Sequence, residues 1–274
     1  MKRLRLLLGT ELPVAAILLF ALAPWVWMVL SSLRPEADLT RAPIRLLPSA
    51  LTLANHIELL GRTSFADNLR DSLVVACGAV ALGLALALPA AYAFSRFRFP
   101  GRRALLVQFL AINMFPVVML ILPLFILFRQ LGLLDTYLAL IAGHATFTLP
   151  FAVWLLTSYM DGIPAELDQA AAIDGATRWQ QLVLVILPLT LPGLVAVGIY
   201  LFISSWNEYL FALMLAGRNV RTVTVALQSF IGENAIQWGL LMAGGTLVAL
   251  PATILFLLTQ RQLVGGLTGG AVKG

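Results

Sequence analysis

Long uncharged stretches alternate with short arginine-containing segments along the whole chain. In each of six stretches, Asp, Glu, Lys and Arg are absent over a length that exceeds the ~20 helical residues needed to cross the ~30 Å hydrocarbon core of a bilayer. The fifth stretch is interrupted by Pro192 and continues past Glu208, so its helix is expected to begin near that proline. We therefore predict spans at residues 12–33, 72–95, 104–128, 136–160, 192–215 and 237–260.

The start of the first predicted span has features of a secretory signal peptide. A basic N-terminus precedes the apolar run, and Ala21-Leu22-Ala23 has the small-residue pattern of a cleavage site. However, Pro24 would follow the cut, and the apolar run continues as far as Met28. We therefore expect a retained first helix.

The segments between the predicted spans are short. The longest are an outer segment at 34–70 and an inner segment at 161–190. The uncharged stretch 222–232 is too short to span, and the alternation in Thr222-Val223-Thr224-Val225 favours an extended conformation. We find no internal repeat or soluble domain, so residues 1–274 are expected to form a single transmembrane domain.

The composition agrees with a membrane protein. The chain has 274 residues, of which 60% are hydrophobic and 11% charged, and the mean hydropathy is +0.93. Soluble domains carry about 25% charged residues, so this chain could not cover a water-exposed surface. An intrinsically disordered chain is excluded by the large apolar content. The predicted fold class is an all-α polytopic membrane protein with six transmembrane helices.

The distribution of arginines predicts the orientation in the membrane. Four arginines fall within residues 96–103, whereas those of the 34–70 segment are spread out. Because positive charge concentrates on the cytoplasmic side, both termini are expected to be cytoplasmic. The net charge of +5 comes from arginines beside apolar runs, so we predict no nucleic-acid partner.

The sequence offers little material for catalysis. Cys77 is the one cysteine, and His56 and His144 lie far apart, so no zinc cluster is expected. The chain contains no G-x-x-x-x-G-K-[ST] phosphate loop and no constellation of Ser, His and Asp. We therefore predict no catalytic residue, no metal site and no cofactor in this chain.

The inner segment 161–190 is the most informative part of the sequence. Pro164 suits the first turn of a short helix, and the following Glu166 and Asp168 favour its N-terminal end. Gly175 can end the helix in a left-handed conformation, and Thr177 begins a capping-box pattern for the next helix. A helix this short is marginal alone and needs a partner surface. It either packs on its own protein or is contacted by another subunit.

This segment resembles the EAA loop of ABC-importer permeases. The pattern is matched by Ala170-Ala171, Gly175 and Ile186-Leu187-Pro188, whereas Gln169 replaces the glutamate after which the motif is named. The resemblance implies a type I importer permease whose loop couples to a cytoplasmic ATPase subunit. The coupling residues that it implies are Glu166, Leu167, Gln169, Ala170, Ala171, Asp174, Gly175 and Ala176.

Other stretches are similar to the carbohydrate-uptake branch of these permeases, which includes the smaller maltose-transporter permease. They are Ser31–Pro35, Ala91–Arg102, Leu131–Thr136, Trp206–Glu208 and Gly266–Gly274. The resemblance implies a bacterial inner-membrane subunit that forms half of a heterodimeric pathway for a sugar. It further implies a second permease, two copies of an ATPase that binds ATP and Mg, and an extracytoplasmic sugar-binding protein.

Polar residues within the predicted spans are candidates for the substrate path or gate. Ionisable side chains in a span cost ~2.5–3.5 kcal/mol on insertion scales, and a sugar needs hydrogen-bonding groups and aromatic faces. Each candidate also has a structural interpretation, such as packing, an interhelical hydrogen bond or an interfacial anchor. The candidates are Asn113, His144, Trp206, Asn207 and Glu208.

Two other function classes remain open. An autonomous secondary transporter driven by an ion gradient would use charged midplane residues and an internal repeat. In this chain, Glu208 is the only acidic residue well inside a predicted span. A structural or signalling scaffold would leave the motif in 161–190 unexplained. Dependence of transport on ATP and on a co-purifying ATPase separates these hypotheses.

Overall fold

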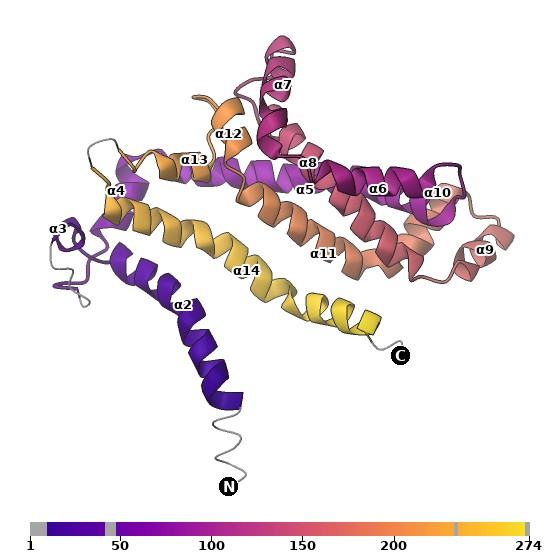
Figure 1. The fold of residues 1–274 in the computed structure, drawn as a ribbon, viewed down its shortest axis with the longest axis horizontal. Coiled ribbons are helices and arrows are strands. Elements are labelled where there is room, and N and C mark those ends of the chain that lie inside the picture. Colours follow the sequence, from indigo (N-terminus) through magenta and orange to yellow (C-terminus); the bar gives the residue numbers. More distant parts are fainter. Residues whose placement is uncertain (1–9, 42–47, 233–234, 272–274) are drawn as a thin grey trace, which may run out of the picture. The chain divides into compact units, whose positions relative to one another are not determined.

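The computed structural model describes residues 10–41, 48–232 and 235–271, with side chains as far as Gln260. These residues are predominantly helical (Figure 1). The helices in chain order are α2 Leu12–Ser32, α3 Glu36–Leu39, α4 Ala54–Arg62, α5 Phe65–Arg96, α6 Arg102–Ile112, α7 Val117–Gln130, α8 Tyr137–Asp161, α9 Glu166–Ile173, α10 Arg178–Gln180, η2 Gln181–Ile186, α11 Leu187–Trp206, α12 Leu210–Leu215, α13 Val223–Gln228 and α14 Trp238–Ala271.

The helices confirm the predicted all-α membrane class. Among the described residues, 5 helices are long and apolar enough to cross a membrane, or 6 if α6 and α7 together make one span. The predicted spans 12–33, 72–95 and 136–160 fall on α2, α5 and α8, and 237–260 falls on α14. α5 begins earlier than its predicted span, at Phe65.

The predicted third span, 104–128, is not one continuous helix. α6 ends at Ile112, α7 begins at Val117, and the two helices are bent by 94°. Pro116 lies at the break, where it has no N–H to donate and disfavours a helical conformation of the preceding residue. The uncharged stretch alone predicted a single helix over this region.

The predicted fifth span, 192–215, also has different bounds. The apolar helix begins at Arg178 and ends at Trp206, and Pro192 lies inside it. A π-helical turn, η2, precedes Pro188, whose missing N–H interrupts the regular hydrogen bonding. The helix ends at Trp206, and the next helix is the six-residue α12.

The expected extended conformation at residues 222–225 is wrong, because α13 begins at Val223. The Ser72 hydroxyl accepts a 2.8 Å hydrogen bond from the Val223 N–H and thereby satisfies one free donor of the first helical turn. Val223, Val225 and Ala226 are all buried. The alternation therefore reflects a short buried helix, which a run of this length does not distinguish from a strand.

The chain forms two compact units. Unit 1 comprises residues 1–67 and 226–251, and unit 2 comprises 68–225 and 252–274. In unit 1, the Asn55 amide donates to the carbonyls of Ser32 and Arg34 after α2, and the Glu36 carboxylate accepts the first N–H groups of α14. The single domain over 1–274 stays a prediction.

Unit 2 is built around the packing of α8 against α5 and α11. Its larger core joins Ala87 and Ala91 of α5, Leu156 of α8 and Leu201 of α11, all with 0% exposed surface. Gly83 lies on the same stripe as Ala79 and Ala87, and a Cβ there would meet the Leu201 side chain at 2.9 Å. These small residues of α5 therefore allow a close helix contact.

Candidate functional site

The loop between α8 and α11 carries the short helix α9, which ends as its sequence predicts. Gly175 has a φ of +84°, its N–H donates to Ala172 O at 3.1 Å, and the Ala176 N–H donates to Ala171 O at 2.9 Å. These two bonds form a Schellman motif, in which glycine adopts the left-handed conformation at lowest cost. The predicted capping box at Thr177 and Gln180 is also present.

The N-terminal end of α9 differs from expectation in one detail. Pro164 precedes the N-cap residue Ala165 and so lies outside the first turn. Asp168 is the one buried residue of α9, all of which the structure describes. Its carboxylate turns toward α5, where the Arg96 Nε donates to Asp168 Oδ2 at 2.8 Å. Asp168 is therefore committed to an ion pair and cannot replace the motif glutamate at position 169.

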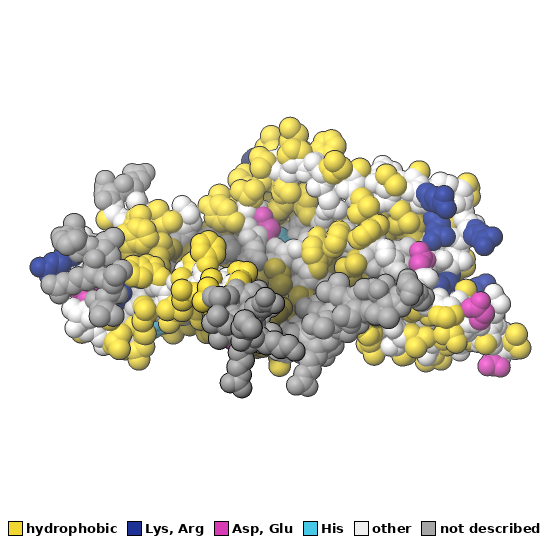
Figure 2. Space-filling view, turned by 60° about the horizontal axis from the view of Figure 1, so that its bottom comes forward, with side chains coloured by type: hydrophobic (Ala, Val, Ile, Leu, Met, Phe, Trp, Pro, Cys, Tyr) yellow, Lys and Arg dark blue, Asp and Glu magenta, His cyan; other side chains and the backbone are white. Residues whose placement is uncertain are grey.

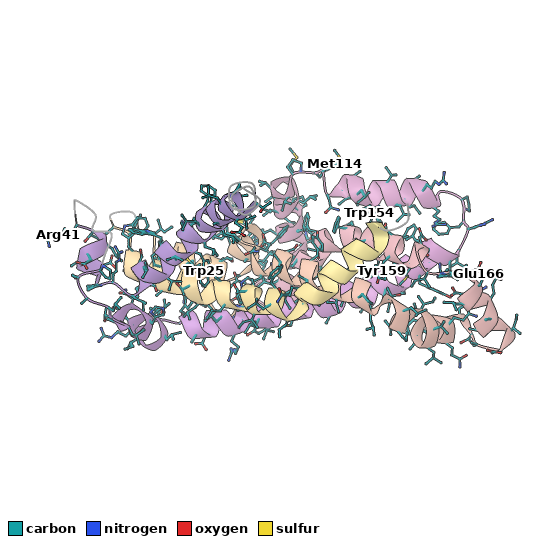
Figure 3. All side chains as sticks on the ribbon, turned by 90° about the horizontal axis from the view of Figure 1, so that it is seen from below. Trp25, Arg41, Met114, Trp154, Tyr159 and Glu166 are labelled. Carbon is teal, nitrogen blue, oxygen red and sulfur yellow. The ribbon has the colours of Figure 1, made fainter. Side chains whose placement is uncertain are left out.

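Away from Asp168, α9 and the following helix α10 expose apolar side chains. Ile173 is 87% exposed, Trp179 of α10 is 65% exposed and Leu167 is 40% exposed. Figure 2 shows acidic and basic side chains together with apolar ones at the end of unit 2 that carries α9. In Figure 3, Glu166 lies at this end, and Trp154 and Tyr159 of α8 lie between it and Met114 at the α6–α7 break. An apolar surface with a charged border is thus available to another protein.

A second candidate site is a cavity of about 460 Å³ in unit 2, within the size range of small-molecule pockets. It lies beside the break between α6 and α7 and the break between α11 and α12. At these breaks, polar backbone groups and side chains take the place of a regular helical surface. Phe115, Phe147, Tyr209 and Phe211 contribute aromatic rings. The polar side chains in its lining are those of Asn113, His144, Thr148, Tyr200, Ser204, Asn207 and Glu208.

His144 and Glu208 connect this cavity to the helix break that follows α11. His144 is 2% exposed, with Nδ1 2.7 Å from Ser205 Oγ and Nε2 3.3 Å from Glu208 Oε2. The Glu208 carboxylate also accepts the N–H groups of Phe211 and Ala212, so it caps α12. Ser205, which bonds the His144 ring, does not itself line the cavity.

The structure brings four of the five predicted path residues to this cavity. Asn113, His144, Asn207 and Glu208 line it, whereas Trp206 is 2% exposed and stacks on Phe202 at 5.6 Å. Sequence analysis missed Thr148, Tyr200 and Ser204. Their signal was available, because Thr148 follows His144 by four residues, and Tyr200 precedes Ser204 by four, so each pair shares a helix face.

Asp135 organises a loop outside the spans. It has a φ of 60°, and its carboxylate accepts hydrogen bonds from the N–H groups of Arg218, Asn219 and Val220. Burial alone would raise the pKa of Asp135, but these hydrogen bonds outweigh it and hold the pKa below its usual value. Within the described part of the chain, no group of three or more His, Cys, Asp or Glu side chains is placed to ligate a metal ion.

Membrane-length helices and a polar cavity among them are features of a membrane transport subunit. The chain belongs to the family of binding-protein-dependent transport system inner membrane components, whose model matches residues 79–268. It is therefore a multi-pass inner-membrane transport component.

Relatives match over nearly the whole chain. The chain is 36% identical to the inner membrane ABC transporter permease protein YcjP of Escherichia coli, over 97% of this chain and 96% of that protein. It is 38% identical to the trehalose transport system permease protein SugB of Mycobacterium tuberculosis, over 93% of each chain. The trehalose/maltose transport system permease protein MalG of Thermococcus litoralis is 36% identical, over 100% of this chain and 98% of that protein.

A solved structure has the same fold. A chain of a bacterial ABC transporter involved in the import of the acidic polysaccharide alginate superposes with a TM-score of 0.79 at 24% identity, covering 93% of this chain and 95% of that one. This likeness concerns the fold alone.

Proposed function

We propose that this chain pairs with a second permease to form the pathway for a carbohydrate, which an extracytoplasmic binding protein delivers and two copies of an ATPase drive inward. The observation that carries this proposal is the exposed apolar face of α9, held in place by a buried ion pair beneath it. The names of two of the relatives, which refer to trehalose and to trehalose or maltose, support a sugar as the substrate.

The ATPase contact follows from the shape of the α9 surface. A helix of eight residues buries little surface against its own protein, so contact with a partner stabilises it. Leu167, Ile173 and Trp179 offer exposed apolar area, and the exposed acidic residues Glu166 and Asp174 stand at the two ends of the helix; a partner surface with an apolar centre and a polar rim would fit this pattern. In this proposal, ATP and Mg bind to the ATPase. To that contact this chain contributes only the surface on which the ATPase docks. The contact requires α9 and both termini to be cytoplasmic.

The cavity of unit 2 has the chemistry that a sugar requires. Its aromatic side chains offer flat apolar faces to the C–H side of a pyranose ring, and its amide, hydroxyl, imidazole and carboxylate groups can bond the hydroxyls. We assign Asn113, Asn207 and Glu208 to the path, with His144 holding the Glu208 carboxylate. Trp206 supports this region by packing on Phe202.

The test begins with purification of the tagged chain in mild detergent and identification of its partners by mass spectrometry. The proposal predicts recovery of an ATPase and a second permease, and ATP-dependent uptake of trehalose or maltose by the complex in liposomes with the binding protein. Uptake by this chain alone, driven by an ion gradient, would overturn the proposal in favour of a secondary transporter.

A pair of matched substitutions tests the contact surface. Ile173→Ser removes the most exposed apolar side chain of α9, and Ile57→Ser alters an isoleucine of α4 that is 70% exposed. We expect only Ile173→Ser to release the ATPase during purification, because only α9 is seated on it. Equal retention of the ATPase by both variants would contradict the assignment of this surface.

A further inference from the structure

The coupling helix α9 buries one of its side chains, that of Asp168, in its own protein. Asp168 is the buried residue of this helix, and its side chain is 6% exposed. The partner, Arg96, is the last residue of α5 and has a side chain that is 8% exposed. The charges are thus withdrawn from solvent and are screened far less than a surface pair.

The Arg96 guanidinium also holds the end of α8. Its Nη1 donates to Met160 O at 3.1 Å, and its Nη2 donates to Ile163 O at 3.0 Å. These carbonyls lie at the C-terminal end of α8, where a cation satisfies free acceptors and the helix dipole. The planar Arg96 side chain therefore joins α5, α8 and α9. It donates four hydrogen bonds in all, of which the fourth is to the neighbouring Ser95 hydroxyl.

The same carboxylate is connected to the segment that follows α9. The Tyr92 hydroxyl donates to Asp168 Oδ1 at 3.1 Å and lies 3.3 Å from Gln181 Oε1. The Gln181 amide donates to Ala176 O, beside the turn that ends α9. Both ends of the α9 segment are thus tied to one face of α5.

We propose that Arg96 and Asp168 are the positioning pair that fixes α9 to α5 and α8, so that displacement of α9 by the ATPase moves these helices instead of being absorbed by the loop. This inference rests on the proposed coupling function. A two-turn helix on flexible connections would follow the ATPase without moving the membrane helices. The pair removes that freedom because its hydrogen bonds constrain both the position and the orientation of α9.

The experiment uses the complete transporter in liposomes with its binding protein. Asp168→Asn keeps the shape of the side chain but removes the charge, and Arg96→Lys keeps the charge but not the planar set of donors. Asp161→Asn is the control for loss of a neighbouring carboxylate, because Asp161 is 48% exposed, lies 3.6 Å from Arg102 and accepts a hydrogen bond from Ser95 Oγ, so it adjoins the network without pairing with α9. Subunit content, basal ATP hydrolysis and substrate transported per ATP are measured for each variant.

We expect Asp168→Asn to keep all subunits and basal hydrolysis but to transport at least tenfold less substrate per ATP. Arg96→Lys should fall between this variant and the wild type, and Asp161→Asn should stay within about twofold of the wild type. A transport-to-ATP ratio in Asp168→Asn equal to that of Asp161→Asn overturns the inference. If Asp168→Asn does not assemble, the ratio in Arg96→Lys decides in the same way.

Failure of the proposed function gives a different result. In that case the wild-type preparation retains no ATPase or shows no ATP-driven uptake, whatever the variants do. A purely structural pair would instead lower the yield and thermal stability of Asp168→Asn and leave the transport-to-ATP ratio of the surviving complexes unchanged. The ratio therefore separates positioning from folding.

Discussion

Replacement of Gly175 by alanine tests whether the turn after α9 must be held in one conformation. The residue has a φ of +84°, and nothing lies within 4 Å of an added Cβ. The substitution therefore causes no clash, and its cost is that of a non-glycine residue in the left-handed region, about 1–2 kcal/mol. This energy changes the ratio of closed to open turn by a factor of about 5–30.

Hydrogen exchange measures this change directly. The N–H groups of Gly175 and Ala176 donate within the Schellman motif, so opening of the turn exposes them to solvent. We expect Gly175→Ala to accelerate their exchange about 5–30-fold and to lower substrate transported per ATP. Gly175→Asn should have a smaller effect, because asparagine is enriched in the left-handed region.

Gly101 provides the matched control. It has a φ of +82°, also with nothing within 4 Å of an added Cβ, but it precedes α6 and not the coupling turn. Gly101→Ala should suffer the same local strain without loss of transport per ATP. The reasoning is refuted if Gly175→Ala leaves exchange and coupling unchanged, or if both alanine variants lose coupling equally.

Three further perturbations address packing, the α12 cap and the outer loop. Gly193→Ala places a Cβ 2.7 Å from Tyr159 Cγ, so overpacking should cost about 1–3 kcal/mol and lower the thermal unfolding temperature in detergent. Gly198→Ala meets nothing closer than 3.8 Å and should not lower it. Glu208→Gln removes the charge from the cap of α12, which should cost about 1 kcal/mol. Hydrogen exchange of the first α12 amides should then become about fivefold faster. Unchanged hydrogen exchange would argue against the cap. The pKa of Asp135 is lower in the folded protein than in the unfolded chain, so its stabilisation is present above about pH 4 and lost as the pH falls through the folded value. The protection of the backbone amides of residues 218–220 against hydrogen exchange should therefore fall only in acid. Asp135→Asn should lower this protection at neutral pH and remove its acid dependence.

Local features of the fold were predictable because neighbouring residues determine them. Gly175 and the capping box at Thr177 end and begin helices through contacts within a few residues. The length of each apolar stretch likewise determines whether it can span a bilayer. The bend at Pro116 was harder to predict, because a proline within an apolar run is tolerated when neighbouring groups satisfy the freed carbonyls, and its sequence does not specify those neighbours.

The residues that sequence analysis missed depend on contacts between distant segments. Arg96 and Asp168 are 72 positions apart, and an arginine beside other arginines after an apolar helix indicates only topology. Similarly, Glu208 was selected for its charge, but its role as the cap of α12 depends on the helix ending at Trp206. Sequence patterns therefore identified the polar groups near the cavity, whereas the folded structure assigned their partners.

The two candidate sites are connected by the same pair of packed helices. α8 carries His144 toward the cavity and Met160 at the Arg96 contact, and their separation of 16 positions corresponds to roughly 24 Å at ~1.5 Å per residue. α11 follows η2 near α9 and ends at the cavity, and the closely packed α8–α11 core does not compress readily. Each helix contains one internal proline, Pro150 in α8 and Pro192 in α11, so the packing of the two helices against each other, and not unbroken hydrogen bonding, keeps them stiff. If α9 couples to an ATPase as proposed, we expect its displacement to be carried along α8 and α11 to the breaks beside the cavity, where the backbone can change conformation at least cost.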